Sequence, residues 1–443
     1  MKPAQPVTTA LNSGSENPSW IATLYGCLRQ AVHRLSVSTI LKSDMTESKR
    51  PRIAHVIDSL DTSGGAEKQL VANLRSFDHG RIQHDLVLLR PSSETRVDEV
   101  PDEVRVTVLF DRGQHPDRVG AFRRLRHLVS SANYDLIHAA LPDSALAARA
   151  VGLTTPTRVV ESLVNISHEP IRTVDNPAVT LRKLALHRFV DGLTMRGVDR
   201  FHAVSRAVAD SWVSVVGIDA RRIEVIPRGI DHQSMANTVL TPAERAALRL
   251  ELDVDPDSPL VLSVGRLEPQ KGHRYLIEGV KLIQSSVPNL RVLIVGREGN
   301  SSAFLKDLIK KLGLERMVRL IGARRDVARL MAASDVFAFP SLFEGNGGNA
   351  MIEAMATGLP IVTTNEAPMT DLVPDERYGI LCPRTDSQAI GEALKKLIED
   401  PRLRERLGAA ARERASGFST PAEIASRFET WYLSLMEGSS PPR

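Results

Sequence analysis

Two glutamates stand on either side of a glycine-rich stretch in the second half of the chain. Glu344 and Glu353 enclose Gly345, Gly347 and Gly348, after an apolar run and before a helical pattern. Glycines let backbone N–H groups approach phosphate or sugar oxygens, and a helix start adds partial positive charge. An ionised carboxylate only accepts hydrogen bonds, so it suits the neighbouring hydroxyls of a ribose or hexose. The stretch indicates a site for a phosphorylated sugar; the alternative is an ordinary strand–loop–helix connection with two solvated glutamates.

A second loop carries two cations. Arg266 and Lys271 lie in V-G-R-L-E-P-Q-K-G (264–272), directly after one apolar run and before the helical pattern of 273–283. At the carboxyl end of a strand, a guanidinium fork and an ammonium point charge together suit a diphosphate. Exposed cations in a loop are also often simply solvated. Beside the acidic glycine loop, the pair favours diphosphate binding.

Length and composition narrow the class of protein. A chain of 443 residues exceeds what one hydrophobic core usually organises, so two domains are expected. Aromatic residues make up only 4%, too few for a surface on which nucleic-acid bases stack. The first 50 residues carry +3 of the net charge of +4 (six Lys/Arg, three Asp/Glu), so the remaining chain is nearly neutral. Both observations argue against a nucleic-acid partner. Cys27 and Cys382 offer neither a disulfide framework nor a metal-ligand spacing. With no long apolar span or compact signal sequence, a cytoplasmic location is expected.

Residues 1–50 differ from the remainder and are predicted to be an N-terminal extension. A start rich in Pro, Ser, Thr and Asn precedes a segment, 20–41, in which leucines recur at helical spacing beside Arg29 and Arg34. Such a basic amphipathic helix would lie on an anionic membrane, giving peripheral contact at its inner face. The alternative is a flexible or docked appendage.

From residue 52 onward, short β-branched runs alternate with helical periods, which is typical of an α/β protein with parallel sheets. Strands are predicted at 53–57, 85–89, 104–109, 136–138, 158–161, 200–204 and 223–226, and then at 260–264, 291–295, 318–321, 336–339, 360–363 and 379–381. The two series predict Rossmann-like domains at 51–235 and 236–415 with a crevice between the carboxyl ends of their strands. A terminal segment, 416–443, has one apolar helical face and is expected to dock back on a domain.

Several motifs in this order resemble the family 4 retaining glycosyltransferases, which have the GT-B fold. The motifs are S-G-G-A-E (63–67), A-V-S (203–205), I-P-R-G-I-D (226–231), G-R-L-E-P-Q-K-G (265–272), V-R-L-I-G-A-R-R-D-V (318–327), A-S-D-V-F-A-F-P-S-L-F-E-G (333–345) and E-A-M-A-T-G-L-P-I-V (353–362). The resemblance extends from residue 52 to about 435, and ordered motifs across two domains are far more specific than any single one.

The resemblance assigns a role to each candidate residue. Arg266 and Lys271 would bind the donor diphosphate, and Glu353 would accept hydrogen bonds from the ribose hydroxyls. Glu344 would face the transferred sugar, together with backbone amides of 345–348. From the other domain, Gly64 and Gly65 would close over the phosphates; the first domain would take the acceptor, in or near 165–188, and the second the donor.

Two departures from the family pattern concern the reacting centre. Eight residues separate Glu344 from Glu353, whereas relatives usually have seven. Ala140 stands where many relatives have a second histidine, two positions after His138. His138 is therefore the remaining candidate for a histidine-assisted step, with a packed structural histidine as the alternative.

The implied reaction moves a sugar from a nucleotide-diphosphate sugar to a glycan, lipid or small-molecule acceptor with retention, without cofactor or metal. Polysaccharide or glycolipid biosynthesis at the cell surface would be its context. The alternatives are a GT-B-fold epimerase or phosphorylase, and a non-catalytic nucleotide-sugar sensor. A hydrolase would need a carboxylate pair acting as acid and nucleophile, and no second acidic pair stands out.

Overall fold

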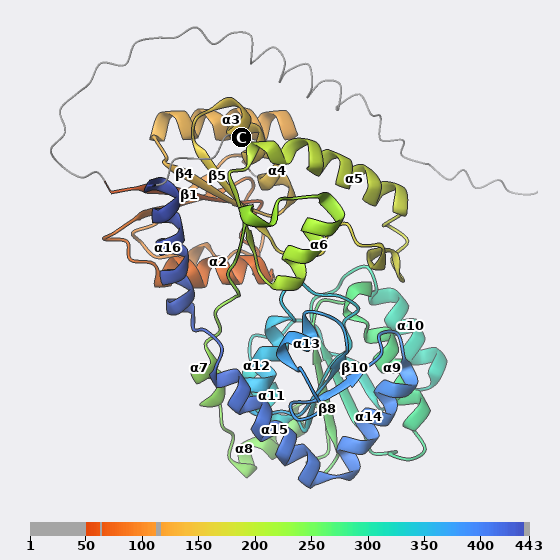
Figure 1. Ribbon diagram of the computed structural model, residues 1–443. Helices are drawn as coiled ribbons and strands as arrows, with labels where there is room; N and C mark the ends of the chain where they lie inside the picture. The colour runs from red at the N-terminus through yellow and green to blue at the C-terminus, as the bar shows by residue number, and fades with distance from the viewer. Residues whose placement is uncertain (1–49, 63, 112–116, 438–443) are drawn as a thin grey trace, which may run out of the picture.

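The computed structural model describes residues 50–62, 64–111 and 117–437, which form two α/β domains (Figure 1). The predicted N-terminal extension lies almost entirely in 1–49, outside the described residues. Within the described part of the chain, no helix combines the length and apolarity that crossing a bilayer requires.

The first domain is built on a parallel sheet, with the strand order β3-β2-β1-β4-β5-β6-β7 among the described residues. Its strands are β1 (Arg52–Ile57), β2 (Gln83–Leu88), β3 (Arg105–Val108), β4 (Leu136–Ala140), β5 (Arg158–Leu163), β6 (Arg200–Ala203) and β7 (Ile223–Val225). Its helices are α2 (Gly65–Ser76), α3 (Arg118–Ala132), α4 (Pro142–Thr154), α5 (Leu181–Thr194) and α6 (Arg206–Val216), with 3₁₀ turns η1 (Val97–Glu99), η2 (Pro170–Thr173), η3 (Met195–Gly197) and η4 (Ala220–Arg222).

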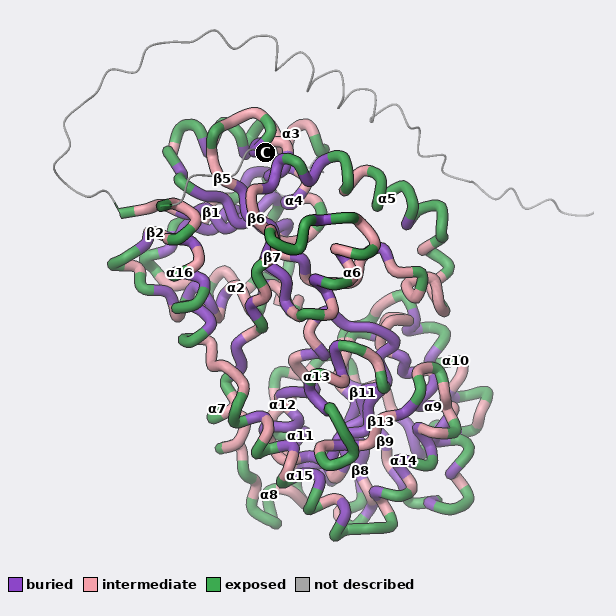
Figure 2. The backbone as a smooth tube through the Cα atoms, viewed as in Figure 1, coloured by how far each residue is buried: buried purple, intermediate pink, exposed green. Residues whose placement is uncertain are grey.

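The two faces of this sheet bury different helices. One face packs against α3, α4 and α6 through residues such as Leu125, Val151 and Trp212. The other packs against α2 and against the last helix of the chain, α16 (Pro421–Glu437), through Leu74 and Phe428. Both cores are buried in Figure 2. Since parallel strands covered on both faces must be apolar throughout, the short β-branched runs of the sequence form this sheet.

The second domain repeats the plan with the strand order β10-β9-β8-β11-β12-β13. Its strands are β8 (Leu260–Val264), β9 (Arg291–Val295), β10 (Val318–Leu320), β11 (Val336–Phe339), β12 (Ile361–Thr364) and β13 (Ile380–Cys382). Its helices are α7 (His232–Ala236), α8 (Pro242–Glu251), α9 (His273–Ile283), α10 (Ser302–Leu312), α11 (Val327–Ala333), α12 (Asn349–Thr357), α13 (Met369–Leu372), α14 (Ser387–Glu399) and α15 (Pro401–Ser416), with the 3₁₀ turn η5 (Pro269–Lys271).

The chain crosses between the domains twice, and the crossings lie side by side. The N–H of Ile230, after β7, donates to the carbonyl of Ser419, just before α16, at 3.0 Å. From there α16 runs up the first domain (Figure 1), where Ile424 and Tyr432 are fully buried. The predicted docking of the terminal helix is therefore confirmed.

The domains meet where strand ends face the crevice. Gly345 of the glycine loop lies so close to the first domain that a Cβ there would be 2.0 Å from the carbonyl oxygen of Val164. The Ser205 hydroxyl, from the start of α6, donates to the carbonyl of Gly345 at 2.5 Å. The loop that carries the chemistry is thus itself a domain contact.

Candidate active site

Lys271 and Glu344 form an ion pair on the floor of the crevice. Lys271 ends η5, which follows β8, and Glu344 follows β11, the strand beside β8. The ammonium donates to Glu344 Oε1, and the Ser341 hydroxyl donates to the same oxygen at 2.8 Å. Only 16% and 8% of the two side chains are exposed, so each charge depends on the other. The loop after β8 and the loop after β11 are joined through this pair.

Arg266 lies on the same loop as Lys271 but remains accessible. Its side chain is 49% exposed, and its Nη1 lies 3.8 Å from Glu268 Oε1, a distance that leaves the guanidinium loosely held. The accessible guanidinium of Arg266, beside the buried ammonium of Lys271, can bind an anion without first breaking a strong ion pair.

Glu353, on α12, contacts the first domain directly. Its Oε1 accepts from the Lys68 ammonium of α2 at 2.5 Å, and the Glu353 side chain is 15% exposed. Lys68 was not among the predicted site residues. It stands four positions beyond Gly64, so its place on the crevice-facing helix start was the available signal.

The glycine loop accommodates its additional residue through left-handed backbone. Gly347 and Gly348 have φ of +79° and +84°, and a Cβ at Gly348 would lie 2.3 Å from the Phe339 ring. Asn346 accepts from the Gly348 N–H at 3.3 Å. Because α12 begins at the next residue, its free N–H groups start here. Positive φ and close neighbours favour glycine at both positions.

The double glycine of the first domain begins α2 and faces the second domain's site. A Cβ at Gly64 would lie 1.9 Å from Glu67 Oε2, and one at Gly65 would lie 3.1 Å from Arg228 Nη1. Burial raises the pKa of the Glu67 carboxyl, whereas the charges of Arg228 and Arg266 act in the opposite direction. Gly64 and Gly65 thus make room for a carboxylate and a cation at the crevice.

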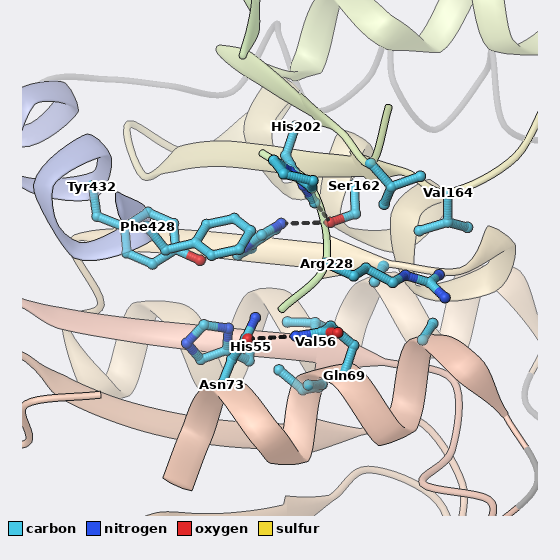
Figure 3. A pocket seen from close by; sticks show the side chains of 16 residues that line it. His55, Val56, Gln69, Asn73, Ser162, Val164, His202, Arg228, Phe428 and Tyr432 are labelled. Atoms are coloured by element: carbon cyan, nitrogen blue, oxygen red, sulfur yellow. Dashed lines mark hydrogen bonds between the residues drawn. The ribbon is translucent and has the colours of Figure 1, made fainter. Parts of the chain in front are cut away.

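Arg228 is the principal residue that sequence reasoning missed. It follows β7, at the edge of the cavity shown in Figure 3. Burial lowers the pKa of its guanidinium, and the nearby carboxylates of Glu344 and Glu67 counteract this. Arg228 therefore brings positive charge from the first domain towards the acidic loop of the second. Its signal was its position in I-P-R-G-I-D directly after a strand.

His138 is buried and lies in a chain of hydrogen bonds that includes Ser162, His202 and Tyr432, which are labelled in Figure 3. His202 Nε2 must donate to the Ile226 carbonyl at 2.8 Å, so His202 Nδ1 accepts from the Ser162 hydroxyl, also at 2.8 Å. Ser162 then accepts from His138 Nε2 at 2.7 Å, which leaves His138 Nδ1 to accept from Tyr432 Oη at 2.5 Å. Every partner in the chain is then satisfied with neutral imidazoles.

Burial and neighbouring histidines hold the pKa of His138 well below its ordinary value, and burial lowers that of His202 to about 4. Both His138 nitrogens have protein partners, and the adjoining cavity of about 60 Å³ has room for water rather than a sugar. The catalytic role of His138 stays a prediction, and this arrangement favours the structural alternative. Ala140 lines the same cavity.

Among residues 50–62, 64–111 and 117–437, no group of three or more His, Cys, Asp or Glu side chains is placed to hold a metal ion. Arg228, Arg266 and Lys271 bring positive charge to the crevice beside the Glu344 loop.

Two family models match the chain, one for each domain. The model described as "Glycosyltransferase Family 4" matches residues 63–234, and "Glycosyl transferases group 1" matches residues 244–414. The D-inositol 3-phosphate glycosyltransferase of Mycobacteroides abscessus is 29% identical over 64% of this chain and 61% of its own length. That of Paenarthrobacter aurescens is 28% identical over 78% of this chain and 82% of its own length.

Solved glycosyltransferase structures share the fold. HepE from Anabaena, solved with UDP and glucose, superposes with a TM-score of 0.72 at 22% identity, covering 86% of this chain and 99% of its own. Sucrose-phosphate synthase from Thermosynechococcus elongatus gives 0.73 at 19% identity, covering 88% and 100%. With both domains matched in order and the expected GT-B architecture present, the chain belongs to glycosyltransferase family 4.

Proposed function

We propose that this protein transfers a sugar from a nucleotide-diphosphate sugar to an acceptor, with retention at the anomeric carbon and without a bound metal ion. The observation that carries the proposal is the convergence of the Lys271–Glu344 pair with Gly65 and Arg228 across the crevice. A diphosphate placed there would meet cations from both domains. HepE, a neighbour in fold, has been solved with UDP-glucose.

The donor would be bound by groups already placed at strand ends. Arg266 and Lys271 would bind the diphosphate, one as a fork and the other as a point charge. Glu353 would accept from the two ribose hydroxyls after Lys68, 52% exposed, gives up its place on the carboxylate. Exchange of a half-exposed ion pair for a ribose costs little, because such pairs contribute at most about 1 kcal/mol.

Bond cleavage would be assisted electrostatically. Glycosyl transfer passes through an oxocarbenium-like state while negative charge grows on the leaving diphosphate. Arg228, Arg266 and Lys271 would stabilise that charge, as a divalent cation does in other enzymes. Glu344, fixed by Ser341 and Lys271, would stand beside the transferred sugar.

The acceptor proposed is a polyol that carries a phosphate group. Arg172, in η2, has a buried Nε without a hydrogen-bond partner among the described residues. Its guanidinium carbon lies 5.7 Å from the centroid of the Phe343 ring, next to Glu344. Relatives are named for an inositol phosphate. The glycan or lipid-linked acceptor predicted from the sequence stays a prediction.

The test uses the full chain and a donor labelled in its sugar. Thermal shift against UDP-, GDP- and ADP-sugars identifies the donor, since a ligand bound only by the folded state raises its stability. The labelled donor is then incubated with inositol phosphates, unphosphorylated polyols and lipid-linked glycans. Label in a new glycoside of an inositol phosphate supports the proposal. Release of an isomerised sugar nucleotide indicates an epimerase, and donor binding without product indicates a sensor.

Arg172→Gln tests the acceptor site separately. It is expected to raise the KM for a phosphorylated acceptor at least tenfold and to leave donor binding unchanged. Arg221→Gln is the matched control, because Arg221 is an exposed arginine of the same domain, paired only with Asp219. Equal KM values for Arg172→Gln and the control would remove Arg172 from the acceptor site.

A further inference from the structure

Helix α5 presents a row of large apolar side chains to solvent. Leu181 and Phe189 are 63% and 62% exposed, and Leu186 and Leu193 are 43% and 37% exposed. Leu186, Phe189 and Leu193 recur at helical spacing on the side away from Leu184, which is buried in the domain, and Leu181 is exposed in the first turn beside them. Figure 2 shows α5 almost entirely as exposed backbone at the outer edge of the first domain. A cluster of large, exposed apolar side chains on one protein surface indicates an interaction site.

Positive charge surrounds this row. Arg182, Lys183 and Arg188 are exposed on α5, and Arg196 is exposed in η3 directly after it. Asp191, the single acidic residue within α5, is turned inward, where it pairs with Arg149 and with His168 Nε2 at 2.9 Å. The outer face of α5 is therefore both apolar and cationic.

The surface beside the helix is hollow and unfilled by described side chains. A shallow basin of about 510 Å³ is lined by the apolar side chains of Phe189, Leu193 and Val216 together with the cations Arg188 and Arg196. A depression lined by both apolar side chains and cations suits molecules with apolar chains and anionic headgroups.

We propose that the face of α5 formed by Leu181, Arg182, Leu186, Arg188, Phe189 and Leu193 binds the surface of an anionic lipid bilayer. A helix of 14 residues extends about 21 Å, long enough to lie in the interfacial plane with aromatic and leucine side chains inserted and cations at the headgroups. The nucleotide-sugar reaction is not needed for this binding.

Charge decides against two other occupants. The first 50 residues of the chain carry six Lys/Arg against three Asp/Glu, so they would be repelled by α5. A second copy docked face to face would set the cations of one α5 against those of the other. An anionic bilayer is complementary to both the apolar row and the charges.

The surface also bears on where the crevice lies. Helix α5 packs against α6, and the residue that caps α6, Ser205, donates to the Gly345 carbonyl of the glycine loop. If α5 binds the bilayer, α6 therefore lies between the lipid headgroups and the glycine loop of the crevice.

The experiment is vesicle flotation of the full chain. Wild-type protein is expected to float with phosphatidylcholine vesicles that contain phosphatidylglycerol, much less with phosphatidylcholine alone, and less as salt is raised. Arg182→Gln with Arg188→Gln is expected to weaken binding about 25-fold, roughly fivefold per cation. Leu181→Gln with Phe189→Gln is expected to abolish flotation, because both side chains are well exposed in the free protein and contribute only when inserted.

Matched controls lie on the second domain. Leu282→Gln with Phe304→Gln removes apolar residues of 62% and 48% exposure, and Lys310→Gln with Lys311→Gln removes two exposed cations of α10; both should float like wild type. The proposal is overturned if wild type does not float, or if the α5 variants float as well as wild type. It is equally overturned if light scattering shows a dimer that the α5 variants lose, which would assign the face to a second copy.

Discussion

Lys271 forms a buried ion pair and, in the proposed site, would also bind the donor diphosphate. Its ammonium is the cation that pairs with the buried Glu344 carboxylate. Lys271→Ala leaves that carboxylate unpaired, at a cost of about 3–5 kcal/mol in the free energy of unfolding. Calorimetric titration should show donor affinity reduced at least tenfold. Lys306→Ala, which removes an exposed pair with Glu298, should change neither quantity, and unchanged donor affinity in Lys271→Ala would remove the diphosphate assignment.

Glu353 and Lys68 should respond in opposite directions. Glu353→Ala removes the proposed ribose acceptor and is expected to weaken donor binding more than tenfold. Lys68→Ala removes a competitor for the same carboxylate, so donor binding should tighten up to about fivefold while stability changes by less than about 1 kcal/mol. Titration of both variants with the same sugar nucleotide checks this. Weaker binding in Lys68→Ala would instead make Lys68 a donor ligand.

At the scale of elements, the start of α12 depends on backbone that only glycine adopts freely. In Gly348→Ala the new Cβ meets the Phe339 ring, and the backbone must hold a φ of +84°. We expect the free energy of unfolding to fall by about 3 kcal/mol. We also expect donor binding to be lost. Gly313→Ala is the control, since its φ is +65° but nothing lies within 4 Å. It should cost about 1 kcal/mol. Equal unfolding midpoints for the two variants would contradict this account.

The docking of α16 should weaken in acid. His202 is neutral in the native state with a pKa lowered to about 4, whereas an unfolded imidazole takes up a proton near pH 6.5. Between these values the unfolded chain holds more protons, so stability falls as pH falls, by about 3 kcal/mol from this group. Denaturation from pH 7 to pH 4.5 measures the slope. Burial also lowers the pKa values of His55, His84, His138 and His273, so His202→Asn should make the slope shallower only by the contribution of His202. An unchanged slope would contradict a contribution from His202.

A substitution at Tyr432 tests the contact between α16 and the buried histidines of the first domain without a change of charge. Tyr432→Phe removes the hydroxyl that donates to His138 Nδ1 and leaves a buried acceptor unpaired, which costs about 1–3 kcal/mol. Tyr378→Phe in the second domain is the control. If His138 is structural, as its partners indicate, kcat should change far less than the unfolding midpoint. A large loss of kcat at unchanged stability would restore the catalytic prediction for His138.

At the scale of the whole molecule, contacts across the crevice set the separation of the domains. Asp175 of the first domain accepts from Arg274 Nη1 at 2.9 Å and from Tyr275 Oη at 2.6 Å, both on α9. Asp175→Ala should enlarge the radius of gyration of the free protein in small-angle scattering and raise the KM for the donor. Saturating donor should restore compactness, because in the proposed site its phosphates would contact both domains. Asp257→Ala, distant from the crevice, should have no effect.

Much of the fold was predictable because the relevant patterns are local. Short β-branched runs mark strands buried on both faces, and every strand expected from the sequence has a counterpart in the structure. The loop of Arg266 and Lys271 and the loop of Glu344 both follow strands. Since parallel strands present their carboxyl ends at one edge of a sheet, their meeting could be predicted.

The tertiary structure alone decided which residues meet across the crevice. Lys68 and Glu353 are 285 residues apart, and no local spacing records such a pair. In the sequence, Arg228 does not differ from other loop cations. In the folded protein its guanidinium lies near Gly65 and is influenced by the charge of Glu344. His138, a catalytic candidate from its place at a strand end, is held by Tyr432 of a helix 294 residues later. Local sequence determines periodicity and turns, whereas contacts between domains depend on how completed elements pack.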